Sequence, residues 1–292
     1  MPAHRSRAAG YAFAGLAVAT TLLIAGPPGA RALAGSGPAT VSAVPPEAVP
    51  SPASASQAPT PTPSASPSPT RSGPYRVVGL GDSVPSGFAC DCISYVSLVG
   101  QHEAAQRHTT ADVSNLAEAG LTTSGLLDQL KGTSVRREIA AADLIIITIG
   151  ANDFDSDSVA DASCSGPDLD CFQSALDRQA SHLTSVVKEV DELLGSRQAT
   201  VLVTGYWNVF LDGDVAAARG TDYRRNSNAL TVVENAQIAK IGQAQGDTYV
   251  DIYTPFKGTS GTKDDTSLLA ADGDHPNAAG HRKIAKALES AL

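Results

Sequence analysis

The sequence lacks several features that would point directly to a function. Acidic residues outnumber basic ones by 30 to 21, which leaves a net charge of −9 and no basic patch of the kind that nucleic-acid binding requires. Neither a P-loop nor a dinucleotide-binding fingerprint is present. The one long apolar stretch, residues 11–25, is shorter than the roughly 20 residues of a bilayer span.

The first 34 residues have the pattern of a secretory signal peptide. His4, Arg5 and Arg7 form a basic start, the apolar stretch follows, and small residues at 30–34 offer a cleavage site of the A-x-A kind. This predicts a secreted protein. An uncleaved N-terminal membrane anchor is the alternative.

Residues 35–74 consist almost entirely of Pro, Ser, Thr and Ala. Such a composition offers too few large apolar side chains to form a core, so we expect a disordered, proline-stiffened linker. The remaining residues, 75–292, are sufficient for one folded domain with an ample core. We expect this domain to be a monomer with no obligate protein partner.

The chain has four cysteines, Cys90, Cys92, Cys164 and Cys171, and disulfides are the default in a secreted protein. Cys164 and Cys171 enclose a short loop and are predicted to pair. Cys90 and Cys92 are separated by one residue, a spacing that is hard to reconcile with relaxed disulfide geometry. Cross-links between the two pairs therefore stay open, and a CxC zinc half-site is a further alternative.

Apolar runs alternate with helical stretches throughout residues 75–292. The run Leu144–Ile149 does not alternate in polarity, which indicates a strand covered on both faces. The predicted strands are Tyr75–Leu80, Asp112–Leu116, Asp143–Ile149, Thr200–Thr204 and Thr248–Ile252. The predicted helices are about Tyr95–Arg107, Ser124–Lys131, Phe172–Leu194, Tyr223–Gln245 and Asn277–Leu292. Such alternation predicts an α/β fold, a three-layer sandwich around a five-stranded parallel sheet.

Four polar or glycine-containing segments lie where predicted strands end or the last helix begins. They are Gly81-Asp82-Ser83, Gly120, Gly150-Ala151-Asn152-Asp153 and Asp272-Gly273-Asp274-His275. In a parallel sheet the active site lies beyond the carboxyl ends of the strands. We therefore expect these segments to converge on one site.

Ser83 is the candidate nucleophile, although a serine at this position can also be a helix N-cap. His275 is the best candidate base, because Pro276 suits the first turn of a helix and would hold the histidine at its entry. Asp272 can accept the proton on the second ring nitrogen, which fixes the tautomer. Asp274 ranks below it, because adjacency is expected to direct its side chain away from the imidazole. The other histidines, in or beside helical stretches, are weaker candidates.

An acyl-transfer site also needs donors for the developing oxyanion. The backbone N–H groups of Ser83 and Gly120 and the side-chain amide of Asn152 can supply them. Individually, Gly120 could be only a turn residue and Asn152 only a turn or cap residue. Their combination with Ser83 and His275, in this order along the chain, favours a catalytic site.

These segments resemble the four sequence blocks of the GDSL/SGNH hydrolases, in particular secreted actinobacterial lipases and esterases. The quoted blocks are Gly81–Gly87, Asn115–Gly120, Gly150–Asp153 and Asp272–His275. The resemblance implies a flavodoxin-like fold without metal or organic cofactor. It also implies Ser83, His275 and Asp272 as catalytic residues, with Ser83, Gly120 and Asn152 as the oxyanion hole. Val84 and Pro85 depart from the usual motif, and Pro85 could alter the shape of the cleft.

The expected activity is hydrolysis of an acyl ester, of the carboxylesterase or lipase kind. A carbohydrate deacetylase, an acyltransferase or a non-catalytic surface-binding protein on the same fold are the alternatives. The loops 84–95, 153–172 and 205–222 are expected to shape the pocket. In the last of them, Trp207, Phe210 and Leu211 could contact an acyl chain or a sugar, or could simply pack at a strand end.

The acidic repeat Asp153, Asp155 and Asp157 resembles the opening of a calcium-binding loop. An EF-hand loop would need Gly and Glu where Ser158 and Cys164 stand. We therefore interpret the repeat as a solvated acidic loop near the rim of the active site.

Overall fold

The computed structural model of the chain describes residues 73–160 and 169–292. Five strands form one parallel sheet in the order β2-β1-β3-β4-β5. They are β1 (Tyr75–Gly81), β2 (Ala111–Asn115), β3 (Leu144–Thr148), β4 (Thr200–Thr204) and β5 (Thr248–Val250). The predicted five-stranded parallel α/β sheet is thereby confirmed. The predicted signal and linker lie outside the described residues.

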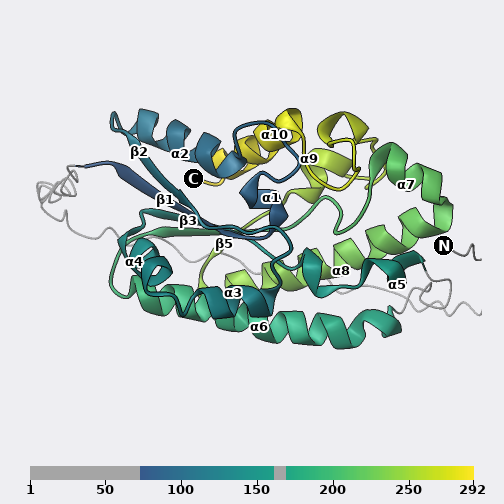
Figure 1. Cartoon of the computed structure of the whole chain (residues 1–292), viewed down its shortest axis with the longest axis horizontal. Helices are drawn as coiled ribbons and strands as arrows, with labels where there is room; N and C mark the ends of the chain where they lie inside the picture. Colours follow the sequence, from purple (N-terminus) through teal and green to yellow (C-terminus); the bar gives the residue numbers. More distant parts are fainter. Residues whose placement is uncertain (1–72, 161–168) are drawn as a thin grey trace, which may run out of the picture. The chain divides into compact units, whose positions relative to one another are not determined.

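Helices cover both faces of the sheet, as Figure 1 shows. α2 (Tyr95–Gln106) packs with α10 (Ala278–Glu289) on one face. On the other face lie α3 (Thr123–Gln129), α4 (Thr133–Ala141), α6 (Asp170–Leu194) and α8 (Thr221–Gln245). The shorter helices are α1 (Ser83–Ser86), α5 (Ser156–Ala160), α7 (Gly213–Arg219) and α9 (Tyr253–Lys257), with single 3-10 turns at Ala151–Asp153 and Thr266–Leu268.

The strand order places β1 and β3 side by side at the centre of the sheet. All five residues of β3 are buried, as expected for a strand covered by helices on both faces. The chain leaves β1 toward one face and β3 toward the other, so the topological switch point of the sheet, where such folds place their active sites, lies between these two strands. Gly81-Asp82-Ser83 follows β1 and Gly150–Asp153 follows β3, whereas Gly120 follows β2 and Asp272–His275 precedes α10.

Two sequence predictions differ from the structure in detail. α10 begins at Ala278 and not at Asn277, because the Asn277 side chain is the N-cap and accepts hydrogen bonds from Ala279 and Gly280 N–H. Pro276 therefore precedes the helix and forms a β-bridge with Leu269. The short helices α4, α7 and α9 are not predicted from the sequence, because each has too few residues to show a clear helical period.

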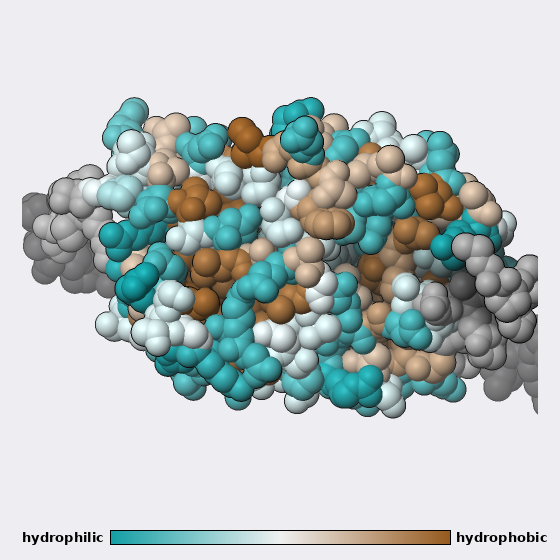
Figure 2. Space-filling view, viewed as in Figure 1, coloured by the Kyte–Doolittle hydropathy of each residue, from teal (hydrophilic) through white to brown (hydrophobic). Residues whose placement is uncertain are grey.

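The surface in Figure 2 is predominantly hydrophilic, with hydrophobic side chains in scattered groups. Within the part of the chain that the structure describes, none of the helices has the length and apolar character needed to cross a bilayer.

Candidate active site

Ser83 is the first residue of α1, directly beyond the carboxyl end of β1. The N-cap of this helix is Asp82, whose carboxylate accepts the Val84 N–H at 3.0 Å, so Ser83 itself does not cap the helix. A Cβ on Gly81 would lie 1.8 Å from the Thr148 carbonyl oxygen, and its φ of 134° is readily adopted only by glycine. Gly81 therefore allows β1 to approach β3 just before Ser83.

The structure brings Ser83, His275 and Asp272 together in one chain of hydrogen bonds. Ser83 Oγ lies 2.9 Å from His275 Nε2, although 192 residues separate the two in sequence. His275 Nδ1 lies 2.8 Å from Asp272 Oδ2. A carboxylate on one ring nitrogen and a hydroxyl on the other is the arrangement that lets an imidazole take a proton from the hydroxyl.

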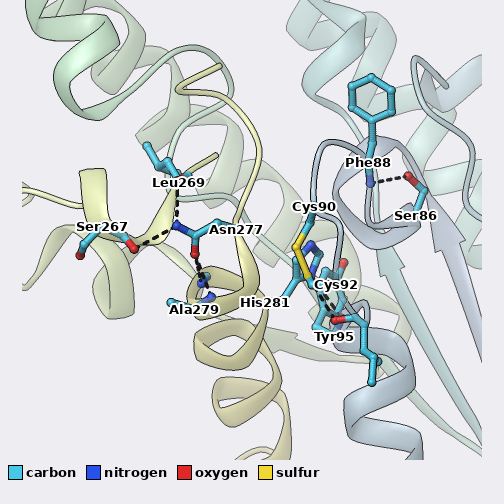
Figure 3. Close-up of a disulfide and its surroundings, with 12 residues drawn as sticks. Ser86, Phe88, Cys90, Cys92, Tyr95, Ser267, Leu269, Asn277, Ala279 and His281 are labelled. Atoms are coloured by element: carbon cyan, nitrogen blue, oxygen red, sulfur yellow. Dashed lines mark hydrogen bonds between the residues drawn. A yellow bond between two sulfur atoms is a disulfide. The ribbon is translucent and has the colours of Figure 1, made fainter. Parts of the chain in front are cut away.

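The loop that carries His275 is fixed by its own backbone and by Asn277. The His275 carbonyl oxygen accepts the Ala270 N–H at 2.8 Å. The Asn277 side-chain amide donates to the carbonyl oxygens of Leu269 and Ser267 at 2.8 and 3.0 Å (Figure 3). The same side chain caps α10, so it joins the loop to the helix. His275 is thus held in place from both sides of its loop.

Two carboxylates lie near His275 Nδ1, and Asp272 is the nearer one. Asp274 Oδ2 is 3.9 Å from Nδ1, so this side chain is not directed fully away from the ring as adjacency suggested. Partial burial opposes ionisation of Asp272. The N–H groups of Asp274 and His275 and the imidazole outweigh that effect and hold the pKa of Asp272 below its ordinary value. Burial raises the pKa of Asp274.

Gly120 and Asn152 lie on two loops that contact each other. Residues 118–121 form a turn in which the Leu121 N–H binds the Glu118 carbonyl at 3.2 Å, with Gly120 at φ 79°. The Glu118 N–H donates to the Gly81 carbonyl, which brings this turn to the end of β1. The Asn152 amide donates to the Leu121 carbonyl at 3.0 Å.

Asp153 secures the same contact between the loops after β2 and β3. Its carboxylate accepts the Thr123 N–H at 2.9 Å and the Thr123 hydroxyl at 2.6 Å, at the first turn of α3. This carboxylate, the first of the acidic repeat, therefore binds a helix N-terminus. The side chain of Asp157 and residue Cys164 lie outside the described residues.

The structure places the sulfur atoms of Cys90 and Cys92 next to each other (Figure 3), and the pairing of the four cysteines stays a prediction. The Cys92 N–H donates to the Cys90 carbonyl at 2.6 Å, so the three residues form a γ-turn. This turn places the two Cα atoms 5.1 Å apart, within the range that a disulfide spans.

Sequence reasoning missed a buried hydrogen bond directly beneath the nucleophile. The Tyr206 hydroxyl donates to Asp82 Oδ2, and the Tyr206 backbone is held at both its N–H and its carbonyl by the side chain of Asn235, at 2.8 Å each. Burial raises the pKa of Asp82 to about 7, while the hydrogen bonds from Tyr206 and from the Val84 N–H act in the opposite direction. The position of Tyr206 after β4 is the only sequence signal that relates it to the site.

We expect Asp82→Asn to change how stability depends on pH. The pKa of Asp82 is raised on folding. Its contribution to the free energy of unfolding is therefore fully present below about pH 4 and is lost as pH rises through 7. Above pH 7 the loss is complete and constant. Urea unfolding from pH 4 to 8 should therefore show a smaller decrease in the free energy of unfolding for Asp82→Asn than for wild type. An identical decrease in both proteins would contradict the assignment.

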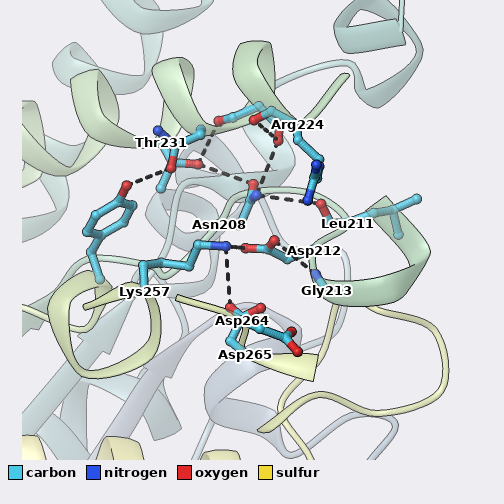
Figure 4. Close-up of polar contacts among 12 residues, drawn as sticks. Asn208, Leu211, Asp212, Gly213, Arg224, Thr231, Lys257, Asp264 and Asp265 are labelled. Carbon is cyan, nitrogen blue, oxygen red and sulfur yellow. Dashed lines mark hydrogen bonds and ion pairs between the residues drawn. The ribbon is translucent and has the colours of Figure 1, made fainter. Parts of the chain in front are cut away.

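A second buried polar cluster supports the loop of His275 from the side of α7 (Figure 4). Lys257 Nζ lies 2.5 Å from Asp212 Oδ2 and 3.7 Å from Asp265 Oδ2, and all three residues are buried. The Asp212 N–H donates to the Gly273 carbonyl at 2.6 Å. A Cβ on Gly273 would lie 2.5 Å from Val215 Cβ, so this turn packs closely on α7.

Lys257→Met is expected to destabilise the fold by about 3–5 kcal/mol, because it leaves two buried carboxylates without their cation. Asp265→Asn is the matched control and should change stability far less, because one lysine then still faces one carboxylate. Both changes are measured by urea unfolding at pH 8. A loss for Asp265→Asn as large as that for Lys257→Met would contradict this account of the charges.

The aromatic side chains expected near the pocket pack inside the domain. Trp207 and Phe210 are buried, and the Trp207 ring stacks on Phe256 with 4.7 Å between ring centroids. Leu211 is partly buried against the core. Simple packing at the end of β4, the alternative that the sequence left open, therefore describes these residues.

Comparisons with known proteins agree with this geometry. The model of the GDSL-like lipase/acylhydrolase family matches residues 80–283. A lipase from a goat rumen metagenome shares 18% identity at a TM-score of 0.59, with 74% of this chain and 97% of that chain covered. An acetylxylan esterase from Geobacillus stearothermophilus shares 21% identity at a TM-score of 0.52, with 73% of this chain and 92% of that chain covered. Phospholipase A1 from Streptomyces albidoflavus shares 24% identity at a TM-score of 0.51, with 75% of this chain and 100% of that chain covered. A search of curated proteins finds no match.

Proposed function

Because this chain belongs to the GDSL-like lipase/acylhydrolase family and is a carboxylic ester hydrolase, we propose that it works through an acyl-enzyme on Ser83. The observation that carries the proposal is the continuous hydrogen-bond chain from Ser83 Oγ through His275 to Asp272, at 2.9 and 2.8 Å. Each of the three side chains has a position that suits one role in acyl transfer.

In the first half of the reaction, Ser83 Oγ attacks the ester carbonyl carbon while His275 Nε2 takes the hydroxyl proton. Asp272 keeps the ring oriented and stabilises the imidazolium that forms. The tetrahedral intermediate collapses, His275 donates the proton to the alkoxy oxygen, and the alcohol leaves. In the second half, His275 takes a proton from water, which attacks the acyl carbonyl carbon. The second tetrahedral intermediate collapses, His275 donates that proton to Ser83 Oγ, and the acid leaves.

The negative oxygen of the tetrahedral intermediate needs donors that are already in place. We assign this role to the backbone N–H groups of Ser83 and Gly120 and to the Asn152 amide. Two contacts support the assignment, since the turn of Gly120 is joined to β1 through the Glu118 N–H and to Asn152 through the Leu121 carbonyl. A single donor of this kind typically contributes about 10²–10³ in rate.

We further propose that the protein is secreted and acts as a monomer on lipid or small acyl esters. The basic start, apolar stretch and small-residue site of residues 1–34 support export. The net charge of −9 fits an uncharged substrate better than a polyanionic one.

Covalent labelling tests the nucleophile without knowledge of the substrate. A fluorophosphonate probe should label the protein once, and peptide mass spectrometry should find the label on Ser83. Heat-denatured protein is the control for nonspecific reaction. Absence of labelling on native protein would favour a non-catalytic binding protein on this fold, and labelling at another serine would refute the assignment of Ser83.

A further inference from the structure

An exposed loop lies directly beside the candidate nucleophile. Residues 88–93 form a loop whose two ends lie close together. A Cβ placed on Gly87, just before the loop, would lie 3.3 Å from the Cβ of Ser94, just after it. Phe88 and Ile93 are the first and last residues of this loop. The γ-turn of Cys90 and Cys92 lies at its tip.

Phe88 is joined to both partners of the proposed proton transfer. Its N–H donates to the Ser83 carbonyl at 3.1 Å, and its ring meets the His275 ring edge-on with 4.9 Å between ring centroids. The side chain nevertheless leaves 53% of its surface exposed. One part of the ring thus rests on the catalytic histidine and the other faces solvent.

Exposed large apolar side chains are unusual in the described part of this chain. Phe88 and Ile93, at 53% and 52%, are the two most exposed of them, and both belong to this one loop. An apolar side chain of this size has a higher free energy in water than when it is buried against another apolar group. The other exposed large apolar residues, Val232, Val233 and Leu292, lie on α8 and at the C-terminus.

We propose that Phe88 and Ile93 form an apolar rim that binds the acyl chain of the ester substrate beyond its first carbons. This inference rests on the proposed function and names the substrate class as esters of extended, uncharged acyl groups. The rim starts at the His275 ring, so a chain that leaves the ester carbonyl can lie across Phe88. Asp91 on the same loop and Asp274 beside His275 disfavour an anionic chain.

The test compares aryl acetate with aryl octanoate for wild type and Phe88→Ala, and the readout is kcat/KM. Covering one methylene is worth about fourfold, so loss of about two covered methylenes should lower kcat/KM on octanoate by about 15-fold. The octanoate-to-acetate ratio of kcat/KM should fall by a similar factor, because an acetyl group is too short to lie across the Phe88 ring. Phe88→Leu should restore most of the octanoate activity, and Ile93→Ser should lower it by a smaller factor than Phe88→Ala.

Val232→Ser is the matched control, because it removes an exposed apolar side chain of α8 and should leave both substrates unaffected. An equal loss on acetate and octanoate in Phe88→Ala would show that Phe88 only supports His275, and would overturn the rim. Wild type that prefers acetate to octanoate would overturn it as well. Failure of the proposed function is distinguished by the fluorophosphonate probe, which should label every one of these variants on Ser83.

Discussion

Ser83→Ala is expected to lower kcat on an aryl acetate by about 10⁴-fold or more, with unchanged folding. The substitution removes the atom that we propose receives the acyl group and leaves His275 Nε2 without the hydroxyl it contacts at 2.9 Å. The remaining rate comes from the oxyanion donors and from binding alone. Thermal unfolding measures the fold, and we expect the free energy of unfolding to change by less than about 0.5 kcal/mol.

Ser86→Ala is the matched control for this experiment. Its hydroxyl donates to the Ser83 carbonyl at 2.8 Å and accepts the Phe88 N–H at 3.2 Å, three residues from the proposed nucleophile. Its loss should lower kcat by less than about tenfold, because the hydrogen bonds it makes are worth about 1 kcal/mol each. Undiminished turnover in Ser83→Ala would end the proposal.

Asp272→Asn is expected to lower kcat by about 10⁴-fold, because an amide at this position favours the wrong tautomer of His275. Asp274→Asn is the informative comparison, since its carboxylate lies 3.9 Å from Nδ1 where that of Asp272 lies at 2.8 Å. We expect Asp274→Asn to lose less than about tenfold. Steady-state kinetics at pH 8 with protein counted by fluorophosphonate titration would measure both. A larger loss in Asp274→Asn would mean that Asp274, and not Asp272, orients His275.

The arrangement of the sheet could be predicted from the sequence because each strand carries its own local signal. Leu144–Thr148 is a continuous β-branched run, and a strand buried on both faces needs no information from elsewhere to be recognised. The segments after β1 and β3 then meet by the geometry of parallel sheets. The contact of His275 with Ser83 depends in addition on the loop that precedes α10, and their catalytic roles stay predictions.

The buried contacts around the site could not be predicted, because they join residues that share no local pattern. Tyr206 binds Asp82 across 124 positions, and Lys257 binds Asp212 across 45. Each contact depends on how α7, α8 and α9 pack beyond the sheet. The close approach of Cys90 and Cys92 depends on a γ-turn, a backbone conformation that composition does not reveal.

Trapping of the acyl-enzyme tests the central claim most directly. The protein is mixed with excess aryl ester, quenched in acid within milliseconds, and analysed as intact protein and as peptides by mass spectrometry. We predict that one acyl group is bound, that it lies on the peptide containing Ser83, and that Ser83→Ala shows none while Ser86→Ala shows it in full. Turnover without any acylated protein at the earliest quench, or an acyl group on another residue, would contradict the mechanism.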